Sequence, residues 1–332
     1  MGERVFVTGG SGYVGAAIVR ALVAAGHGVR GLARSETSAQ ALSALGAEPV
    51  RGDLLDARSL DTGAQGSTVV VHAAGSLTSA ARYADHERTN VEGTRLVLAA
   101  AKRAGAKRLI YISAASVVVD ADRPTDGDES LPVMFHRSMA YSATKGIAER
   151  LVLEANGPSM VTLALRPPGV WSEDAPFIDI LGVAFRQHRF VWISGGEFPY
   201  SVCHVDNLAS AVVQSIEHGR GGQPYFVTDN ETSTMRSFFT ALMEAAGYPA
   251  KGPAVPYWFV ALLGRLIGFT FSLFRPGKIP PLTLENVRMM GHTLRVSSAR
   301  AKRELCYSPP VNRTDGLERI RGARRLATPG IA

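Results

Sequence analysis

The chain of 332 residues contains only two cysteines, Cys203 and Cys306, which stand far apart and without the spacing of metal ligands. We therefore expect neither a disulfide framework nor a metal site, and the low cysteine content is typical of a protein of the reducing cytosol. The sequence begins directly with a strand pattern, which predicts no signal peptide. Although the formal charge is +7, no basic run is interleaved with aromatic residues, so nucleic acid is not an expected partner.

The first fifteen residues predict a buried strand, a glycine turn and a helix. The strand pattern 4–8, with the apolar run Val5–Val7 at its centre, leads directly into the turn that contains Gly9, Gly12 and Gly15. Gly9 would allow a sharp turn, Gly12 would let the backbone approach a pyrophosphate, and Gly15 would let the helix pack against the strand. The free N–H groups and the dipole of the helix N-terminus would then face the phosphates. This context predicts a dinucleotide site, and the alternative is a plain turn.

Strand and helix patterns alternate along the rest of the chain, which is typical of an α/β fold with a parallel sheet. The expected strands lie at 28–34, 49–52, 68–75, 109–118, 163–171 and 223–228, and a long helix is expected from Asn90 to Arg103. We divide the chain into a nucleotide-binding domain, 1–168 completed by about 204–230, and a smaller substrate-binding domain, 169–203 and 231–322, with a tail at 323–332.

The second expected strand ends without an acidic residue. An NAD-binding fold has Asp or Glu there to hold the ribose 2′-hydroxyl, whereas this chain has Arg34 followed by Ser35. A guanidinium would pair with a 2′-phosphate. The sequence thus favours NADP(H) and leaves NAD(H) open; alternatively, Arg34 stacks on the adenine or lies in solvent.

The spacing of Tyr141 and Lys145 places both side chains on one face of an expected helix. A phenol is a poor base at neutral pH, but a neighbouring ammonium and an oxidised nicotinamide would favour the phenolate. Tyr141 would then exchange a proton with a carbonyl or carbinol oxygen. Lys145 would also bind the ribose of the nicotinamide. The alternative is two ordinary residues on a helix surface.

Together, the pattern Thr8-Gly9-x-x-Gly12-x-x-Gly15, the helix-borne Asn90-Val-x-Gly-Thr94 and the pair Tyr141-x-x-x-Lys145 resemble the extended short-chain dehydrogenase/reductase family. The segment 253–309 looks most like the 3β-hydroxysteroid dehydrogenase and sterol-decarboxylase branch. The resemblance implies a doubly wound Rossmann sheet with a C-terminal substrate domain, and hydride transfer between NADP(H) and a ketone or secondary alcohol. The cofactor residues that it implies are Gly9, Gly12, Tyr13, Val14, Arg34, Asp53, Leu54, Ala73, Ala74, Gly75, Tyr141, Lys145, Pro168 and Val170.

One position departs from the family pattern. The family serine that binds the substrate oxygen corresponds here to Ala114, within Ser113-Ala-Ala-Ser116. If the strand continued, Ser116 would point to the same face as Ala114 and could replace it. We therefore expect the catalytic set Tyr141, Lys145 and Ser116, with Ser113 as the substitute if the strand bulges. A missing hydroxyl would instead suggest a weakly catalytic nucleotide-binding sensor, and a sugar-nucleotide epimerase would use the same Tyr and Lys.

Several other residues receive structural interpretations. We expect His72 to be packed and hydrogen-bonded, and Asp53 either to lie beside the adenine or to form an Asx turn. His204 and Asp206 are interpreted as structural, with Asp206 as a helix N-cap. Trp171 and Phe177 are expected to line the substrate side.

The segment 254–274 is dense in aromatic and aliphatic residues and is nearly long enough to cross a bilayer, but Pro256 and Arg265 argue against a clean span. Three interpretations remain: a helical lid over an apolar pocket, an anchor on a membrane surface, or core of the small domain. We predict a small apolar substrate, steroid-like or long-chain, and a cytoplasmic protein. Membrane contact and a homodimer remain open.

Overall fold

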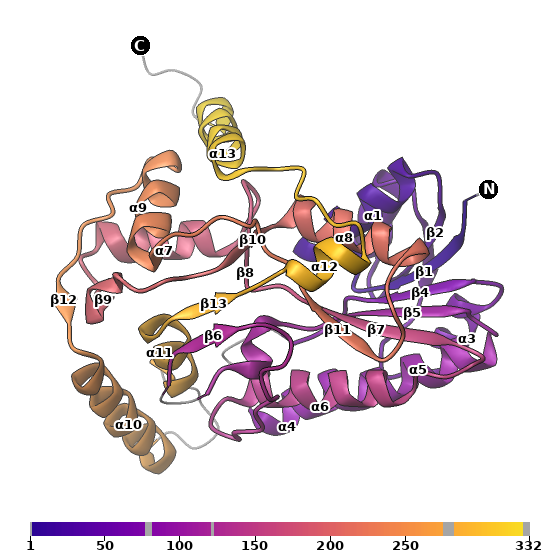
Figure 1. Ribbon diagram of the computed structural model, residues 1–332, viewed down its shortest axis with the longest axis horizontal. Coiled ribbons are helices and arrows are strands. Elements are labelled where there is room, and N and C mark those ends of the chain that lie inside the picture. Colours follow the sequence, from indigo (N-terminus) through magenta and orange to yellow (C-terminus); the bar gives the residue numbers. More distant parts are fainter. Residues whose placement is uncertain (1, 77–81, 121–122, 275–281, 328–332) are drawn as a thin grey trace.

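The centre of the structure is a seven-stranded sheet in which every strand pair is parallel (Figure 1). The computed structural model describes residues 2–76, 82–120, 123–274 and 282–327. The strands of the sheet are β1 (Arg4–Thr8), β2 (Gly28–Ala33), β3 (Glu48–Arg51), β4 (Val69–His72), β5 (Arg108–Ile112), β7 (Val161–Arg166) and β11 (Gln223–Phe226). Their order is β11-β7-β5-β4-β1-β2-β3, so the direction of winding reverses between β1 and β4. In a sheet of this kind, ligands bind beyond the carboxyl ends of the strands at that switch point.

Helices cover both faces of the sheet, which explains why its strands are apolar runs rather than alternating patterns. One layer contains α1 (Tyr13–Ala24), α2 (Glu36–Ala44) and α8 (Val205–Glu217), and the other contains α3 (Ala57–Ala64), α5 (Gly93–Arg103) and α6 (Ala140–Glu154) (Figure 1). In β1, Val5 and Val7 are buried in the core under the first layer, and Phe6 is buried in the core under the second. The predicted doubly wound α/β fold is therefore confirmed.

A second hydrophobic core lies beyond the sheet, around the fully buried Trp171 and Trp192. The strand pairs around it are β8 (Gly169–Trp171) with β10 (Val202–His204), β6 (Thr125–Gly127) with β13 (Leu294–Val296), and β9 (Trp192–Ile193) with β12 (Ala254–Val255). Its helices are α7 (Phe177–Arg186), α9 (Met235–Ala245), α11 (Leu284–Gly291) and α13 (Arg313–Ala327), whereas α12 (Ala299–Glu304) packs on the first core through Ala301. Trp171 packs inside this core and so does not line an open substrate side. The domain boundaries stay a prediction, and the last five residues of the tail lie outside the described part of the chain.

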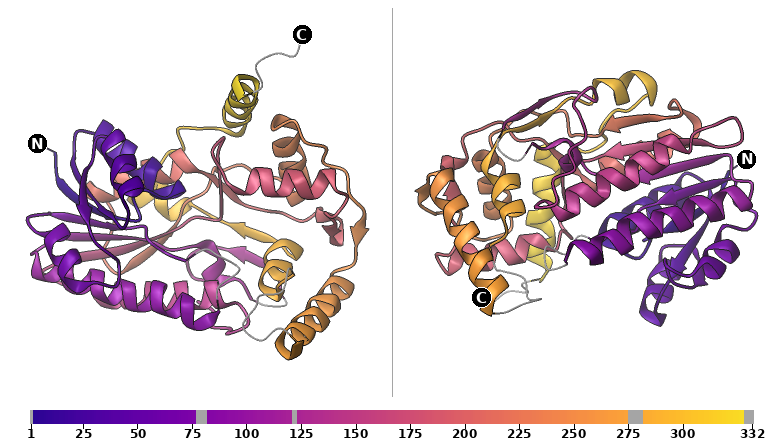
Figure 2. Two further views of the ribbon diagram at one scale, coloured as in Figure 1. Left: turned by 180° about the vertical axis from the view of Figure 1, so that it is seen from behind. Right: turned by 90° about the horizontal axis from the view of Figure 1, so that it is seen from below.

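Helix α10 (Tyr257–Phe274) is the apolar segment with three interpretations. It lies at the periphery, at the end of the molecule opposite the N-terminus (Figures 1 and 2). Val260 and Ala261 are buried in a small core that it shares with α11, whereas Trp258 and Leu266 expose 66% and 55% of their surface. The interpretation as plain core is therefore wrong for the outer face of this helix. Among the described residues, no helix has both the length and the apolarity needed to cross a membrane.

Three local expectations are corrected by the backbone. The strand expected at 109–118 ends at Ile112, and Ala115–Val118 form a 3₁₀ turn. The α-helix expected from Asn90 begins at Gly93 as α5, because residues Glu87–Glu92 form a π-helical turn that includes Asn90. Finally, the N-cap of α8 is His204, whose ring accepts a hydrogen bond from the N–H of Asp206.

Candidate functional site

The glycine turn after β1 has the geometry that a pyrophosphate requires. Gly9 adopts a φ of +76°, and the N–H of Gly12 donates to its carbonyl at 3.1 Å. A Cβ on Gly15 would lie 1.9 Å from the Gly9 oxygen, so only glycine fits there. A Cβ on Gly12 would meet only that oxygen, at 3.4 Å. The space above Gly12, at the N-terminus of α1, therefore stays open for a phosphate group.

The small residues after β4 lie against this turn. A Cβ on Gly9 would come within 2.6 Å of the Ala74 nitrogen, so the two strand ends touch. One residue further, a Cβ on Gly75 would lie 3.3 Å from Asn90 Oδ1 and 3.8 Å from Lys145 Nζ. The glycine turn, the segment Ala73–Gly75 and Lys145 thus share one edge of the sheet. A nicotinamide dinucleotide fits this edge.

Lys145 lies inside this edge rather than on a helix surface. Its ammonium donates to the carbonyl of Ile112, at the end of β5, and lies 4.1 Å from the centre of the Tyr111 ring. Burial lowers the pKa of Lys145 to about 7, and the carboxylate of Glu149 acts in the opposite direction. The lysine is therefore held by a carbonyl and a ring face, close to the turn that follows β4.

Tyr141 lies one turn before Lys145 on α6, and its ring meets the edge of the buried His86 ring at 6.1 Å between centroids. Burial raises the pKa of Tyr141, and the negative charge of Glu285 raises it further. The sequence argument expected Lys145 to lower this pKa. In the protein alone the pKa is raised instead, because a buried phenolate would lose its hydration and Glu285 adds a nearby negative charge.

The residues around the missing family serine are now placed. Ala114 is extended, but Ser116 belongs to the 3₁₀ turn, so the argument from strand alternation does not apply to it. Ser113 and Ser116 are both buried, and neither hydroxyl has a hydrogen-bond partner within the described part of the chain. A buried hydroxyl without a partner carries a desolvation cost, which a substrate oxygen could relieve. The structure leaves both serines open as replacements for Ala114.

Arg34 follows the last residue of β2 directly and is exposed. The register of the sheet pairs Ala33 with Arg51 at the end of β3, so a second guanidinium belongs to the same edge. Arg51 lies 3.6 Å from Glu36, and Ser35 caps α2 by accepting from the N–H of Ser38. This end of the sheet therefore carries two exposed arginines and one carboxylate.

The remaining expected cofactor residues have clear structural partners. Asp53 Oδ1 accepts from the N–H of Leu55 at 2.9 Å, which is the Asx turn of the second interpretation. Leu54 packs against Gly93, where a Cβ would lie only 2.8 Å from Leu54 Cδ2. Tyr13 hydrogen-bonds Ser172 at 2.9 Å and so ties the glycine turn to the segment after β8. Val14 packs on the first core, Pro168 is buried after β7, and Val170 is part of β8.

Two histidines have structural roles, as the sequence predicted. His72 bridges Thr8 at 2.7 Å and Thr94 at 2.9 Å, and burial, aided by Lys145, lowers its pKa to about 3. The neutral ring thus links β1, β4 and α5. His204 packs edge-on against Trp171 at 4.9 Å.

Asp229, which the sequence did not single out, accepts three hydrogen bonds at the second core. Its donors are the indole of Trp171 at 2.7 Å, the N–H of His204 at 2.5 Å and the amide of Asn207 at 2.7 Å. Burial raises the pKa of Asp229 to about 6 despite these donors. Glu285 was also missed, because it reaches the start of α6 from 143 residues further along the chain and no spacing signals such a contact.

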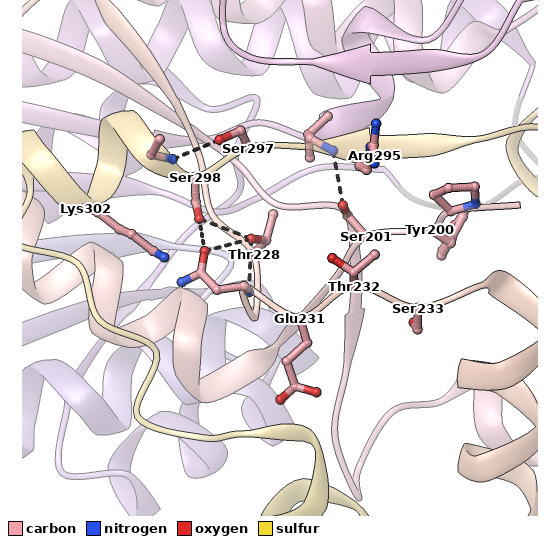
Figure 3. Close-up of a pocket in the computed structure, with 14 residues that line it drawn as sticks. Tyr200, Ser201, Thr228, Glu231, Thr232, Ser233, Arg295, Ser297, Ser298 and Lys302 are labelled. Atoms are coloured by element: carbon pink, nitrogen blue, oxygen red, sulfur yellow. Dashed lines mark hydrogen bonds between the residues drawn. The ribbon is translucent and has the colours of Figure 1, made fainter.

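A separate cavity of about 250 Å³ lies between the loop after β11 and the segment after β13 (Figure 3). Its lining is rich in hydroxyl groups, and Thr228, Asn230 and Ser298 hydrogen-bond one another there. Neither the glycine turn nor Tyr141 nor Lys145 lines it. Among the described residues, no cluster of three His, Cys, Asp or Glu side chains could hold a metal ion.

Comparison with known proteins identifies relatives over almost the whole chain. The model of the 3-beta hydroxysteroid dehydrogenase/isomerase family matches residues 6–256. A 4-hydroxy-2-methyl-3-oxo-4-farnesyl-3,4-dihydroquinoline-1-oxide ketoreductase from Stigmatella aurantiaca is 38% identical over 96% of each chain. A 2-alkyl-3-oxoalkanoate reductase from Stenotrophomonas maltophilia is 30% identical over 96% of this chain and 99% of its own.

Solved structures agree on the fold. A short-chain dehydrogenase/reductase superfamily protein from Agrobacterium tumefaciens, solved with bound NAD, has a TM-score of 0.73 and 21% identity over 98% of both chains. At this identity the likeness concerns the fold alone.

Proposed function

This chain belongs to the 3-beta hydroxysteroid dehydrogenase/isomerase family and is an oxidoreductase that interconverts ketones and secondary alcohols, and we propose that Tyr141 and Lys145 carry the proton-transfer part of that reaction. The observation that carries the proposal is the placement of Lys145 Nζ at the carbonyl of Ile112 and beside Gly75, next to the glycine turn. A nicotinamide dinucleotide, when bound, supplies or accepts the hydride.

The roles of the two side chains follow from their surroundings. Tyr141, on the first turn of α6 and one turn before Lys145, donates its phenolic proton to the oxygen of the ketone during reduction and takes it back during oxidation. Lys145 holds the ribose of the nicotinamide and places a positive charge near the phenol, which favours the phenolate. Ser116 donates a hydrogen bond to the substrate oxygen, with Ser113 as the alternative. The open space above Gly12 receives the pyrophosphate.

We propose NADP(H) as the preferred cofactor. Arg34 is exposed at the end of β2, where an acidic residue would otherwise repel a 2′-phosphate, and Arg51 is at the adjacent strand end. Paired guanidinium groups and the hydroxyl of Ser35 suit a phosphate dianion. Glu36 acts against this preference by engaging Arg51 at 3.6 Å.

We propose a substrate in which the ketone adjoins a long apolar group. Two relatives support this: the Stigmatella enzyme is named for a farnesyl-bearing quinoline, and the Stenotrophomonas enzyme for a 2-alkyl-3-oxoalkanoate. Both names describe a ketone next to a carbon that carries a hydrocarbon group, which in the Stigmatella name is a farnesyl chain. The support from this chain's own residues is the apolar helix α10, which shares a small core with α11.

We also propose that α10 lies on the surface of an anionic membrane, from which such a substrate could be taken. The helix has no acidic residue, carries the exposed Arg265, and belongs to a protein with a formal charge of +7. Trp258, Leu262 and Leu266 expose 66%, 46% and 55% of their surface. An apolar face with basic charge suits the interface of anionic lipids.

Sedimentation with phosphatidylserine-containing vesicles tests the membrane proposal. The variant L262E/L266E should remain in the supernatant, because two charges on the apolar face oppose its insertion. The matched control is L326E on α13, where the leucine is 85% exposed, and it should sediment like the wild type. No sedimentation of the wild type would contradict the proposal. A change of oligomeric state in L262E/L266E would also contradict it and would indicate that a second copy covers α10.

The enzymatic proposal is tested by reduction of a 2-alkyl-3-oxoalkanoate with NADPH. Replacement Y141F should lower kcat by at least about 100-fold, the usual contribution of a positioned acid, while cofactor binding stays unchanged. The matched control is Y83F on α4 (Tyr83–His86), which removes another phenolic hydroxyl near this end of α6. Equal rates for the wild type and Y141F would contradict the proposal, and net interconversion of sugar nucleotides without net cofactor turnover would indicate an epimerase instead.

A further inference from the structure

The first turn of α6 is capped by a residue from a distant helix. Glu285, at the start of α11, accepts the N–H of Ser142 at 3.0 Å, the N–H of Tyr141 at 3.3 Å and the hydroxyl of Ser142 at 2.9 Å. Met139 occupies the N-cap position of α6 and supplies no capping side chain. The carboxylate of α11 thus satisfies N–H groups that a helix start leaves without intrahelical partners.

A second contact fixes α11 to the same place. Arg288 follows Glu285 by three residues, so both side chains lie on one side of α11. Its Nη1 donates to Ser138 Oγ at 2.7 Å, just before α6 begins. The start of α11 is itself capped by Thr283, whose hydroxyl accepts the N–H of Asn286. Two hydrogen-bonding side chains therefore clamp the residues on either side of the α6 N-cap.

We propose that Glu285 is a positioning residue for catalysis, which holds the first turn of α6, and with it Tyr141, in the place from which the phenol reaches the substrate oxygen. This inference rests on the proposed function, since it concerns the same tyrosine. Tyr141 belongs to the first turn of α6, where the capping bonds are made, whereas Lys145 is anchored independently by the carbonyl of Ile112. A loss of the cap should therefore displace Tyr141 more than Lys145.

The charge of Glu285 has a second consequence. The ring of Tyr141 meets His86 from α4, its phenol interacts electrostatically with that of Tyr111 from β5, and its N–H is held by Glu285 from α11. Arg288 of α11 binds Ser138 just before α6, and Lys145 follows one turn later on the same helix. Burial raises the pKa of Tyr141, and Glu285 raises it further because a carboxylate disfavours a nearby phenolate. Removal of that charge should lower the pKa of the phenol, which a role in folding alone would not do.

The test compares two substitutions of Glu285 in the full chain, with NADPH and a 2-alkyl-3-oxoalkanoate. E285Q keeps one oxygen that can accept from Ser142 but removes the charge and the second acceptor, which takes the N–H of Tyr141, whereas E285A removes both oxygens. Reduction requires a protonated Tyr141, so kcat/KM falls at high pH as the phenol ionises. In E285Q this alkaline limb should move to lower pH by about 1 unit, the lower limit for a nearby charge. The matched control E244Q removes an exposed charge on α9 and should leave the limb in place.

E285A should show the same shift together with a lower kcat and faster hydrogen exchange at the amides of Tyr141 and Ser142, because the capping acceptor is gone. An active wild type whose alkaline limb coincides with that of E285Q would overturn this inference and leave the proposed function standing. A wild type without ketone reduction would overturn the proposed function and the positioning role with it.

Discussion

Glu149 and Arg166 form a bidentate ion pair that is almost completely removed from solvent. The oxygens of Glu149 lie 2.6 Å and 2.9 Å from two nitrogens of Arg166, and the side chains expose 1% and 3% of their surface. Glu149 is four residues after Lys145 on α6, and Arg166 ends β7 just before the turn at Pro167 and Pro168. The pair therefore joins the helix of Tyr141 and Lys145 to the segment that contains the expected cofactor residues Pro168 and Val170.

Loss of one partner from this pair should destabilise the protein strongly. E149Q leaves the guanidinium of Arg166 buried without a counter-charge, which typically costs about 3–5 kcal/mol. The matched control is E154Q on the same helix, because Glu154 and Arg150 form an exposed pair at 3.9 Å. That substitution should cost under about 1 kcal/mol. Urea unfolding of the two variants measures both values, and equal free energies of unfolding would contradict the prediction.

Asp229 should make stability depend on pH in the acidic range. Its pKa is about 6 in the folded chain against an ordinary 3.8, so folding favours the protonated form. The stabilisation is therefore fully present below about pH 4 and is lost as the pH rises through 6. A difference of about two units between the folded and unfolded pKa corresponds to about 3 kcal/mol in the free energy of unfolding. We therefore expect the free energy of unfolding of the wild type, measured with urea relative to D229N, to fall by about this amount between pH 4 and pH 7. If the free energies of the two proteins changed in parallel with pH, the prediction would be contradicted.

The sequence predicted the nucleotide-binding half of the fold well, because its signals are local. The glycine turn, the Tyr141-to-Lys145 spacing and the apolar strands each depend on neighbours in the chain. The contacts that were missed join distant segments: Glu285 reaches the start of α6, and Asp229 gathers Trp171, His204 and Asn207. No pattern within a single segment encodes such pairings.

The local errors have physical causes of their own. The run 109–118 is apolar enough to continue as a strand, but the chain turns at Ala115, whose N–H donates to the carbonyl of Pro167 at 2.8 Å. At α8 the expected cap was Asp206, yet His204 fills that position and Asp206 instead pairs with Arg319 at 2.7 Å. Capping preferences favour Asp over His, so at this helix they select Asp206, two positions after the residue that forms the cap.

Cofactor preference should depend on Arg34. R34A should raise the KM for NADPH by about 10- to 100-fold, because a charge-assisted hydrogen bond contributes about 1.5–3 kcal/mol. The KM for NADH should change little, since that cofactor has no 2′-phosphate. E36Q should lower the KM for NADPH by releasing Arg51. The control R321A removes an exposed arginine on α13. Equal effects of R34A on both cofactors would indicate that Arg34 contacts the adenine or only solvent.

Activity measurements can show which of the two buried serines, Ser113 or Ser116, binds the substrate oxygen. If Ser116 binds the substrate oxygen, S116A should lower kcat/KM for ketone reduction by about 10- to 100-fold, the free energy of one hydrogen bond to a developing charge. S113A is the matched control, because Ser113 is equally buried and its hydroxyl also has no partner among the described residues. Neither substitution removes an existing hydrogen bond of a hydroxyl, so both variants should unfold at concentrations of urea close to that of the wild type. A loss confined to S113A would assign the role to Ser113. Full activity in both variants would show that Tyr141 alone binds the substrate oxygen, with Ala114 leaving the family's second donor unfilled.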